Sequence, residues 1–75
     1  MKKNINEFRK GDQIRITHID CGRNIKKRLT ELGLFLGSSL EIIKNDKFNP
    51  VVLGIFDSKI ALGRGEASKI YGEKI

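Results

Sequence analysis

Residues 28–43, with the sequence RLTELGLFLGSSLEII, decide which fold this chain can adopt. The first part has the pattern of a short amphipathic helix that ends at Gly33. Gly37 then marks a tight turn before a strand that begins near Ser39. A helix of about two turns between strands is too short for the crossover of an ordinary βαβ unit. It suits a small β-barrel in which one helix closes an end.

The size of the chain predicts a single domain that spans residues 1–75. Its apolar runs fall short of the roughly 20 residues that cross a bilayer, and residues 4–10 lack the apolar segment of a signal peptide. The single cysteine, Cys21, agrees with a reducing compartment. These features together predict a cytoplasmic protein.

Alternating apolar and polar residues predict short antiparallel strands. The expected strands are residues 13–18, 39–44, 51–56, 59–62 and 69–73. Residues 57–58 are expected to turn a hairpin, and Ile19 breaks the alternation, which predicts a bulge or the end of pairing there.

Strands this short leave long open edges unless the sheet curls on itself, and closure removes those edges. The predicted fold is therefore mostly β, a small SH3-like β-barrel of about five antiparallel strands with one short α-helix between strands 1 and 2. An OB-type barrel is the nearest alternative, but its helix usually lies later in the chain.

The helix is expected to begin after an N-cap at Asn24 and to pack one apolar stripe on the barrel. In the polar lead-in, Ile5 and Phe8 are spaced so that one turn folds them against the body. The residues expected to be largely buried are Ile14, Ile16, Ile25, Leu29, Leu32, Leu34, Leu40, Ile42, Val52, Ile60, Leu62 and Ile70.

No group of residues has the pattern of a catalytic or metal site. His18 and Cys21 lie three apart, but an extended strand turns them to opposite sides, and a structural zinc site needs four ligands. Residues 63–65 lack the Lys-Ser/Thr ending of a P-loop. We therefore expect no metal, no cofactor and no enzymatic activity.

Apolar residues in expected loops predict an interaction surface. One barrel end cannot bury Leu34, Phe35 and Leu36 together, so Leu34 is expected in the core and Phe35 or Leu36 outside it. Phe48 lies in a polar loop. With the basic residues Lys26 and Lys27 of the helix, Phe35, Leu36 and Phe48 are the predicted partner-binding residues.

The formal charge of +6 leaves a small basic RNA- or ribosome-associated barrel open as an alternative. Acidic residues are interleaved with the basic ones along the chain, and only residues 23–28 are locally of one sign. Proteins that bind single strands usually add exposed aromatic residues for stacking. Here the aromatic residues are few and expected mostly to pack: Phe8, Phe35, Phe48, Phe56 and Tyr71.

The chain resembles the FeoA family over residues 11–70. The resemblance is carried by four pieces in the expected order: GDQIRI (11–16), KRLTELGL (27–34), GSSLEI (37–42), and IAL (60–62) with EASKI (66–70). Two residues depart from the family pattern. Leu36 stands where the family often has proline, and Gly63 stands where it often has arginine.

The resemblance implies an SH3-like barrel and a non-enzymatic accessory or regulatory role in ferrous iron transport. It implies contact with FeoB, a membrane permease with a cytosolic GTP-binding domain. The chain is then expected to reach the membrane only through this partner, and to be a monomer or a weak homo-oligomer. A free-standing relative of the SH3-like domain of metal-dependent repressors is a further alternative.

Overall fold

The computed structural model describes residues 3–75. Its elements, in chain order, are β1 (Lys3–Asn4), the 3₁₀ turn η1 (Ile5–Glu7), β2 (Gln13–Ile19), α1 (Arg23–Glu31), β3 (Ser39–Lys44), β4 (Val51–Ile55), β5 (Ser58–Leu62), α2 (Arg64–Ala67) and β6 (Ile70–Lys74). The predicted domain of residues 1–75 begins with residues 1–2, which lie outside the described residues.

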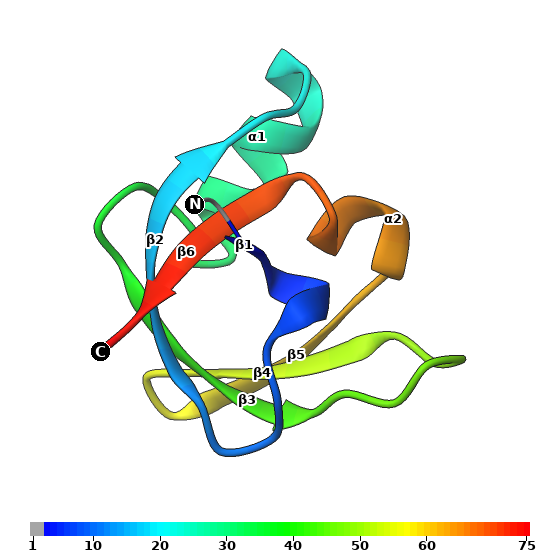
Figure 1. The fold of residues 1–75 in the computed structure, drawn as a ribbon. Helices are drawn as coiled ribbons and strands as arrows, with labels where there is room; N and C mark the ends of the chain where they lie inside the picture. Colours follow the sequence, from blue (N-terminus) through cyan, green and yellow to red (C-terminus); the bar gives the residue numbers. More distant parts are fainter. Residues whose placement is uncertain (1–2) are drawn as a thin grey trace.

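The strands form one antiparallel sheet with the order β1-β6-β2-β3-β4-β5. The sheet curls into a barrel around the core (Figure 1). β2 to β6 confirm the five predicted strands, and the two-residue β1 adds a sixth beside β6. The predicted position of the helix is confirmed too, because α1 lies between β2 and β3.

The start of α1 differs from the prediction, because Gly22 and not Asn24 is the N-cap. Gly22 has an extended backbone, with φ −67° and ψ 166°, and no side chain caps this end. Its carbonyl accepts the first helical hydrogen bond from the N–H of Lys26, at 2.9 Å. Asn24 therefore lies inside the first turn, where its side chain cannot act as a cap.

The end of α1 forms as predicted, with Gly33 in the left-handed region at φ +93°. The N–H of Leu34 donates to the carbonyl of Leu29 at 2.8 Å, and the N–H of Gly33 donates to that of Thr30 at 3.0 Å. These two bonds make a Schellman motif, which satisfies carbonyls that the helix leaves free. The motif turns Leu34 back into the core, where it is fully buried beside Leu29.

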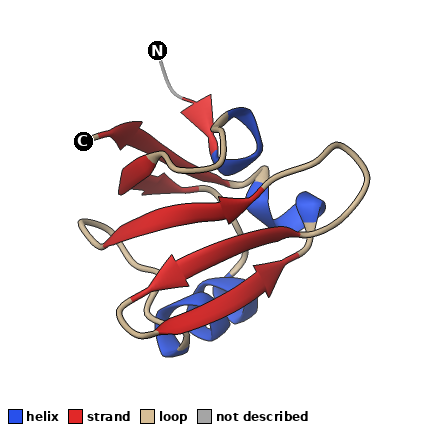
Figure 2. Ribbon diagram, turned by 90° about the horizontal axis from the view of Figure 1, so that it is seen from below, coloured by secondary structure: helices blue, strands red, loops and turns tan. Residues whose placement is uncertain are grey.

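α1 covers the side of the barrel that no strand closes, next to the edge strand β5 (Figure 2). Near one end of the helix, Arg28 forms an ion pair with Glu66 of α2 at 3.3 Å. Just past this same C-terminal end, a Cβ on Gly33 would lie 3.3 Å from Cγ2 of Ile55 in β4. Leu29, between these two contacts, has no exposed surface. The helix thus replaces a strand in closing the barrel.

Most predicted core residues are buried, namely Ile14, Ile16, Leu29, Leu34, Leu40, Ile42, Leu62 and Ile70. Ile25 and Ile60 are only partly buried and pack against the edge of this cluster. Ile5 and Phe8 are buried, which confirms that the lead-in folds one turn against the barrel.

Two predicted core residues are wrong. Val52 is not in the core, because β4 turns Val51, Leu53 and Ile55 inward and leaves Val52 on the other face. Three consecutive apolar residues at 51–53 fit either register, so alternation alone could not decide between them. Leu32 is 39% exposed, because the chain reverses at Gly33 and Leu34 takes the inward position.

The bulge in β2 lies at Thr17 and not at Ile19. The pairing of β2 with β6 shifts between Ile16 and His18, so Thr17 is the extra residue. Ile19 still pairs with Ile70 and packs against the core. The inserted residue reverses the alternation, which explains why Ile19 looks out of phase in the sequence.

Gly72 of β6 is needed for a close approach between strands. It is buried and pairs with Ile16 of β2. A Cβ at this position would lie 2.5 Å from Cγ2 of Ile14 and 2.7 Å from the carbonyl oxygen of Arg15. Any larger residue would therefore force β6 away from β2.

The packing of α1 can be tested by shortening its buried side chain. Leu29→Ala removes a fully buried side chain and should lower the free energy of unfolding by about 2–5 kcal/mol. Leu32→Ala is the matched control on the same helix end, and it should cost under about 1 kcal/mol because Leu32 is partly exposed. Urea denaturation followed by circular dichroism measures both. Equal losses would mean that α1 does not dock through Leu29.

Candidate interaction surface

The loop that follows α1 exposes two neighbouring apolar residues. Phe35 is 45% exposed and Leu36 is 56% exposed, so both, rather than one of them, lie outside the core. A tight turn fixes them: the N–H and hydroxyl of Ser38 donate to the carbonyl of Phe35 at 3.0 and 2.7 Å, and Gly37 has φ +88°. The N–H of Gly37 also donates to the carbonyl of Ile16 in β2, at 2.8 Å. The pair is therefore held on a rigid turn.

Phe56 is a further exposed aromatic residue, and the prediction of a strand over residues 51–56 is wrong at this position. β4 ends at Ile55, which pairs with Ser58, so the hairpin turn is Phe56-Asp57 and not residues 57–58. Phe56 is 90% exposed and has φ +54°, a left-handed conformation that is costly for a bulky side chain. The first central residue of such a two-residue turn is usually glycine or asparagine. A phenylalanine here contributes little to the fold.

Phe56 lies beside the end of α1 and the loop after it. Its Cε2 would be 3.8 Å from a Cβ on Gly33, and it lines a shallow surface pocket with Ser39 of β3. In Figure 2 the loop between α1 and β3 and the turn between β4 and β5 lie at the same end of the barrel. We call the exposed residues Leu32, Phe35, Leu36 and Phe56 the apolar end.

The predicted basic residues Lys26 and Lys27 are both exposed on α1. Lys27 precedes Leu32 by five residues, which is about 8 Å along a helix axis. Arg28 is drawn toward α2 by its ion pair with Glu66. Lys26 and Lys27 therefore form a basic margin on α1, more than one helical turn before the apolar end.

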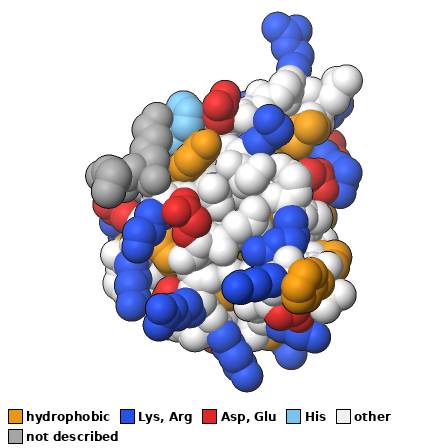
Figure 3. Space-filling model, turned by 45° about the vertical axis from the view of Figure 1, so that its right-hand side comes forward, with side chains coloured by type: hydrophobic (Ala, Val, Ile, Leu, Met, Phe, Trp, Pro, Cys, Tyr) orange, Lys and Arg blue, Asp and Glu red, His pale blue; other side chains and the backbone are white. Residues whose placement is uncertain are grey.

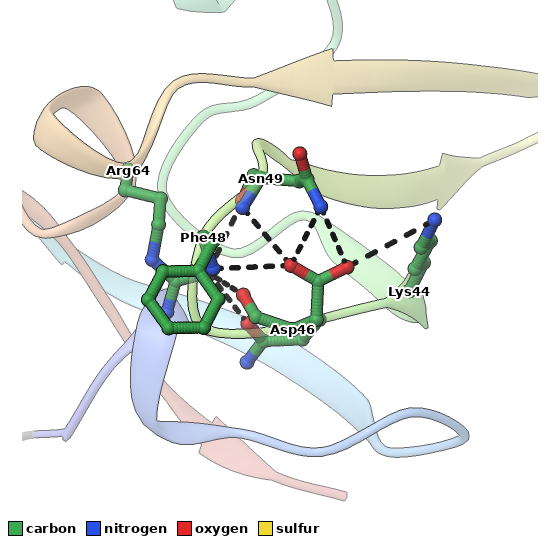
Figure 4. Close-up of polar contacts among 6 residues, drawn as sticks. Lys44, Asp46, Phe48, Asn49 and Arg64 are labelled. Carbon is green, nitrogen blue, oxygen red and sulfur yellow. Dashed lines mark hydrogen bonds and ion pairs between the residues drawn. The ribbon is translucent and has the colours of Figure 1, made fainter.

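Phe48 is the most exposed of these aromatic residues, at 91%, and it lies at the tip of the loop between β3 and β4. Asp46 organises this loop: its carboxylate accepts hydrogen bonds from the N–H groups of Phe48 at 3.1 Å and Asn49 at 2.9 Å, and from Nδ2 of Asn49 at 3.0 Å (Figure 4). The side-chain bond from Asn49 and the backbone bonds keep the pKa of Asp46 below its usual value of 3.8, outweighing desolvation.

Arg64 of α2 clamps the same loop. Its Nη1 donates to Oδ1 of Asn45 at 2.8 Å and to the backbone carbonyls of Asp46 and Asn49 (Figure 4). Nδ2 of Asn45 in turn donates to the carbonyl of Phe8. Gly63, where the family pattern often has arginine, is the N-cap of α2, and the contacts to the loop come from the next residue.

The structure does not bring Phe48 together with Phe35 and Leu36. β4 separates the two regions: the Phe48 loop precedes Val51 and the Phe56 turn follows Ile55, a span of about 17 Å at 3.3 Å per residue. Figure 2 shows the long loop and the β4–β5 turn at opposite ends of these strands. The predicted residues therefore form two separate surfaces.

The residues first considered for metal binding do not converge. His18 packs near Tyr71, with ring centroids 5.8 Å apart, and Cys21 is partly buried against the core. Over residues 3–75, no three His, Cys, Asp or Glu side chains are placed to hold a metal ion together.

The expectation that the aromatic residues mostly pack is wrong for the phenylalanines. Phe8 is buried, but Phe35, Phe48 and Phe56 are largely exposed. The available sequence signal was the turn-favouring residues nearby: Asn49 follows Phe48, Asp57 follows Phe56, and Gly33 and Gly37 lie two residues to either side of Phe35.

The backbone cost at Phe56 predicts a variant that is more stable than the natural chain. Phe56→Asn should raise the free energy of unfolding by about 0.5–1 kcal/mol, because asparagine accepts a positive φ and almost no buried area is lost. Phe56→Ala removes the same ring but keeps the unfavourable φ, so it should change stability little. Thermal unfolding compares the two variants, and an asparagine no better than alanine would argue against strain at this turn.

The lowered pKa of Asp46 predicts that the hydrogen bonds of the Phe48 loop are lost in acid. Its pKa is lowered by folding, so its contribution is complete above the unfolded value of 3.8 and is lost as the pH falls through the folded value. Below that pH, the amide resonances of Phe48 and Asn49 should shift together in NMR spectra while those of β2 stay fixed. Asp46→Asn should shift them already at neutral pH. If neither the fall in pH nor Asp46→Asn shifts the amide resonances of Phe48 and Asn49, this carboxylate does not organise the loop.

Sequence comparison finds relatives of this chain. The FeoA domain family matches residues 3–74. A protein of Methanocaldococcus jannaschii named "Putative Fe(2+) transport protein A" is 37% identical over 65 residues, which cover 87% of this chain and 78% of that protein. Among the described residues, no helix combines the length and the apolar character needed to span a membrane.

Solved structures show the same fold. A crystal structure described as Iron Uptake Regulatory Protein (FeoA) has a TM-score of 0.92 at 23% identity, over 100% of both chains. A manganese-dependent transcriptional repressor has a TM-score of 0.89 at 18% identity, over 99% of this chain and 42% of the repressor. At these identities the likeness shows the fold alone, and it confirms the SH3-like barrel. With the family match over nearly its whole length, this chain belongs to the FeoA domain family.

Proposed function

We propose that this chain is a non-enzymatic, cytoplasmic accessory protein of a ferrous iron transport system. Its family and the name of its relative from Methanocaldococcus jannaschii support the link to Fe(2+) transport. It acts by direct contact with the cytosolic GTP-binding domain of a FeoB-type membrane permease. It needs no cofactor for this role.

The observation that carries the proposal is the apolar end. Small soluble domains rarely hold several large apolar side chains in water side by side, and such a patch usually marks an interface. Phe35 and Leu36 sit on a turn fixed by Ser38, so little conformational entropy is lost when they bind. Phe56 occupies its turn with a positive φ, a backbone conformation that is unfavourable for phenylalanine.

The basic margin defines the charge of the partner surface. Lys26 and Lys27 are exposed on α1, the helix that leads into the apolar end, and would face acidic residues of the permease domain. Rim charges mainly raise the association rate, while the apolar centre sets the lifetime of the complex. The two parts of the surface therefore make separable contributions.

The experiment measures binding of the lipid-free permease domain to the full chain by stopped-flow and calorimetry. Phe35→Ala with Leu36→Ser should weaken binding at least about 30-fold, as expected for the loss of an interface centre. Lys26→Glu with Lys27→Glu should mainly slow association and flatten its dependence on salt. Both variants should unfold like the natural chain, since no core side chain is removed.

The matched control is Lys3→Glu with Lys69→Glu, which changes the net charge equally at exposed sites away from α1. It should leave association close to that of the natural chain. If both test variants bind normally, the contact does not use this surface. If the natural chain does not bind the domain at all, the proposed partner is wrong.

A further inference from the structure

The Phe48 loop, residues 45–50, has an ordered structure that the proposed contact with the permease does not explain. It lies at the opposite end of β4 from Phe56, and yet it holds a phenylalanine almost entirely in water. Asp46 and Arg64 fix the loop with side-chain hydrogen bonds (Figure 4). A loop of residues this polar would ordinarily be mobile, so its order calls for a separate explanation.

Several backbone polar groups of the loop are hydrogen-bonded within the protein. Asp46 accepts from the N–H groups of Phe48 and Asn49, Arg64 donates to the carbonyls of Asp46 and Asn49, and Pro50 has no N–H. Unsatisfied backbone groups are the main cost of moving a loop out of water. These internal bonds lower the cost of moving the loop into a less polar medium.

The surroundings of Phe48 are cationic. Lys44 and Lys47 are exposed on either side of Asp46 in the chain. At the base of the loop, Nδ2 of Asn45 donates to the carbonyl of Phe8, and the chain continues from there through Arg9 and Lys10 to Gly11, whose N–H donates to the carbonyl of Ile42 in β3. Figure 3 shows Lys and Arg side chains spread over the drawn face of the molecule, with Asp and Glu side chains between them.

The acidic groups nearby are already engaged. Asp46 accepts the backbone bonds of the loop and lies 3.9 Å from Nζ of Lys44. Asp12 accepts from the N–H of Arg9 and pairs with Lys74 at 3.3 Å. Within residues 44–49 and Arg64, which clamps them, the three cationic side chains Lys44, Lys47 and Arg64 outnumber the one carboxylate, Asp46.

We propose that the Phe48 loop docks on an anionic membrane surface. The phenyl ring enters the boundary between headgroups and acyl chains, and the flanking lysines meet the lipid phosphates. One apolar tip with cationic shoulders is the usual anatomy of an interfacial anchor. A protein-binding centre is instead ringed by further apolar contacts that exclude water, which describes the apolar end and not this loop.

The inference rests on the proposed function only for its location beside a membrane permease. A single ring and a few cations give reversible binding, since stable anchoring needs stronger or additional signals. The loop would thus hold the protein near the bilayer while the apolar end contacts the permease. The chain would then reach the membrane by itself, and not only through its partner.

The test uses vesicles without any permease, so it can fail or succeed independently of the proposed function. The full chain is sedimented with equimolar phosphatidylglycerol and phosphatidylcholine vesicles, and with phosphatidylcholine vesicles alone. We expect binding to the anionic vesicles only, weakened at least about tenfold between about 0.1 and 0.5 M salt. Phe48→Ala should reduce the partition coefficient about tenfold.

Phe56→Ala is the matched control, because it removes an equally exposed ring, 90% against 91%, from the other end of the same strand. It should change vesicle binding by less than about twofold, because the ring of Phe56 lies outside the proposed membrane contact. Lys44→Glu with Lys47→Glu should abolish binding. Intact amide shifts in β2 and β6 would show that each variant is folded.

Three results would overturn the inference. The first is no binding of the natural chain to anionic vesicles. The second is an equal loss for Phe48→Ala and Phe56→Ala, which would mean that exposed rings adsorb without regard to site. The third is that Phe48→Ala binds vesicles normally but no longer binds the lipid-free permease domain or a single-stranded RNA oligonucleotide. The loop would then be a protein or nucleic-acid contact.

Discussion

The structure depends on one hydrogen-bonded reversal, in which the N–H of Leu34 donates to the carbonyl of Leu29 at 2.8 Å. The bond ends α1 and holds both leucines in the core. Because β5 has a strand partner on one side only, the barrel needs α1 to cover the remaining side. The same reversal leaves no room inside for the next two residues. Exposure of Phe35 and Leu36 is thus a direct consequence of how the barrel is closed.

The sequence predicted the architecture because its main signals are local. Gly33 after an apolar stripe marks a helix end, and alternation marks the strands on either side. Prediction failed where the structure is determined by contacts between residues that are far apart in the sequence. Val52 and its neighbours fit two registers, and only pairing with β3 and β5 selects one. The need for glycine at position 72 comes from Ile14 and Arg15, which the surrounding sequence cannot reveal.

The candidate site was predicted less completely than the fold. Exposure of Phe48 and of one of Phe35 and Leu36 followed from there being more apolar residues than one core could bury, while the structure exposes both members of the pair. Their separation into two surfaces did not, because it depends on which end of β4 each loop joins. Phe56 was missed because a phenylalanine after an apolar run reads as strand, and its positive φ is visible only in three dimensions.

The place of β6 has a consequence for how the protein is made. Residues 70–74 come late in the chain, but they lie between β1 and β2, in the interior of the sheet (Figure 1). During synthesis, β2, α1, β3 and the β4–β5 hairpin emerge from the ribosome without the strand that joins β2 to the N-terminal segment. The growing chain therefore carries an unpaired strand edge until translation has passed residue 74. Completion of the sheet depends on this long-range pairing, and contacts of that kind generally slow folding and leave strand edges open to aggregation.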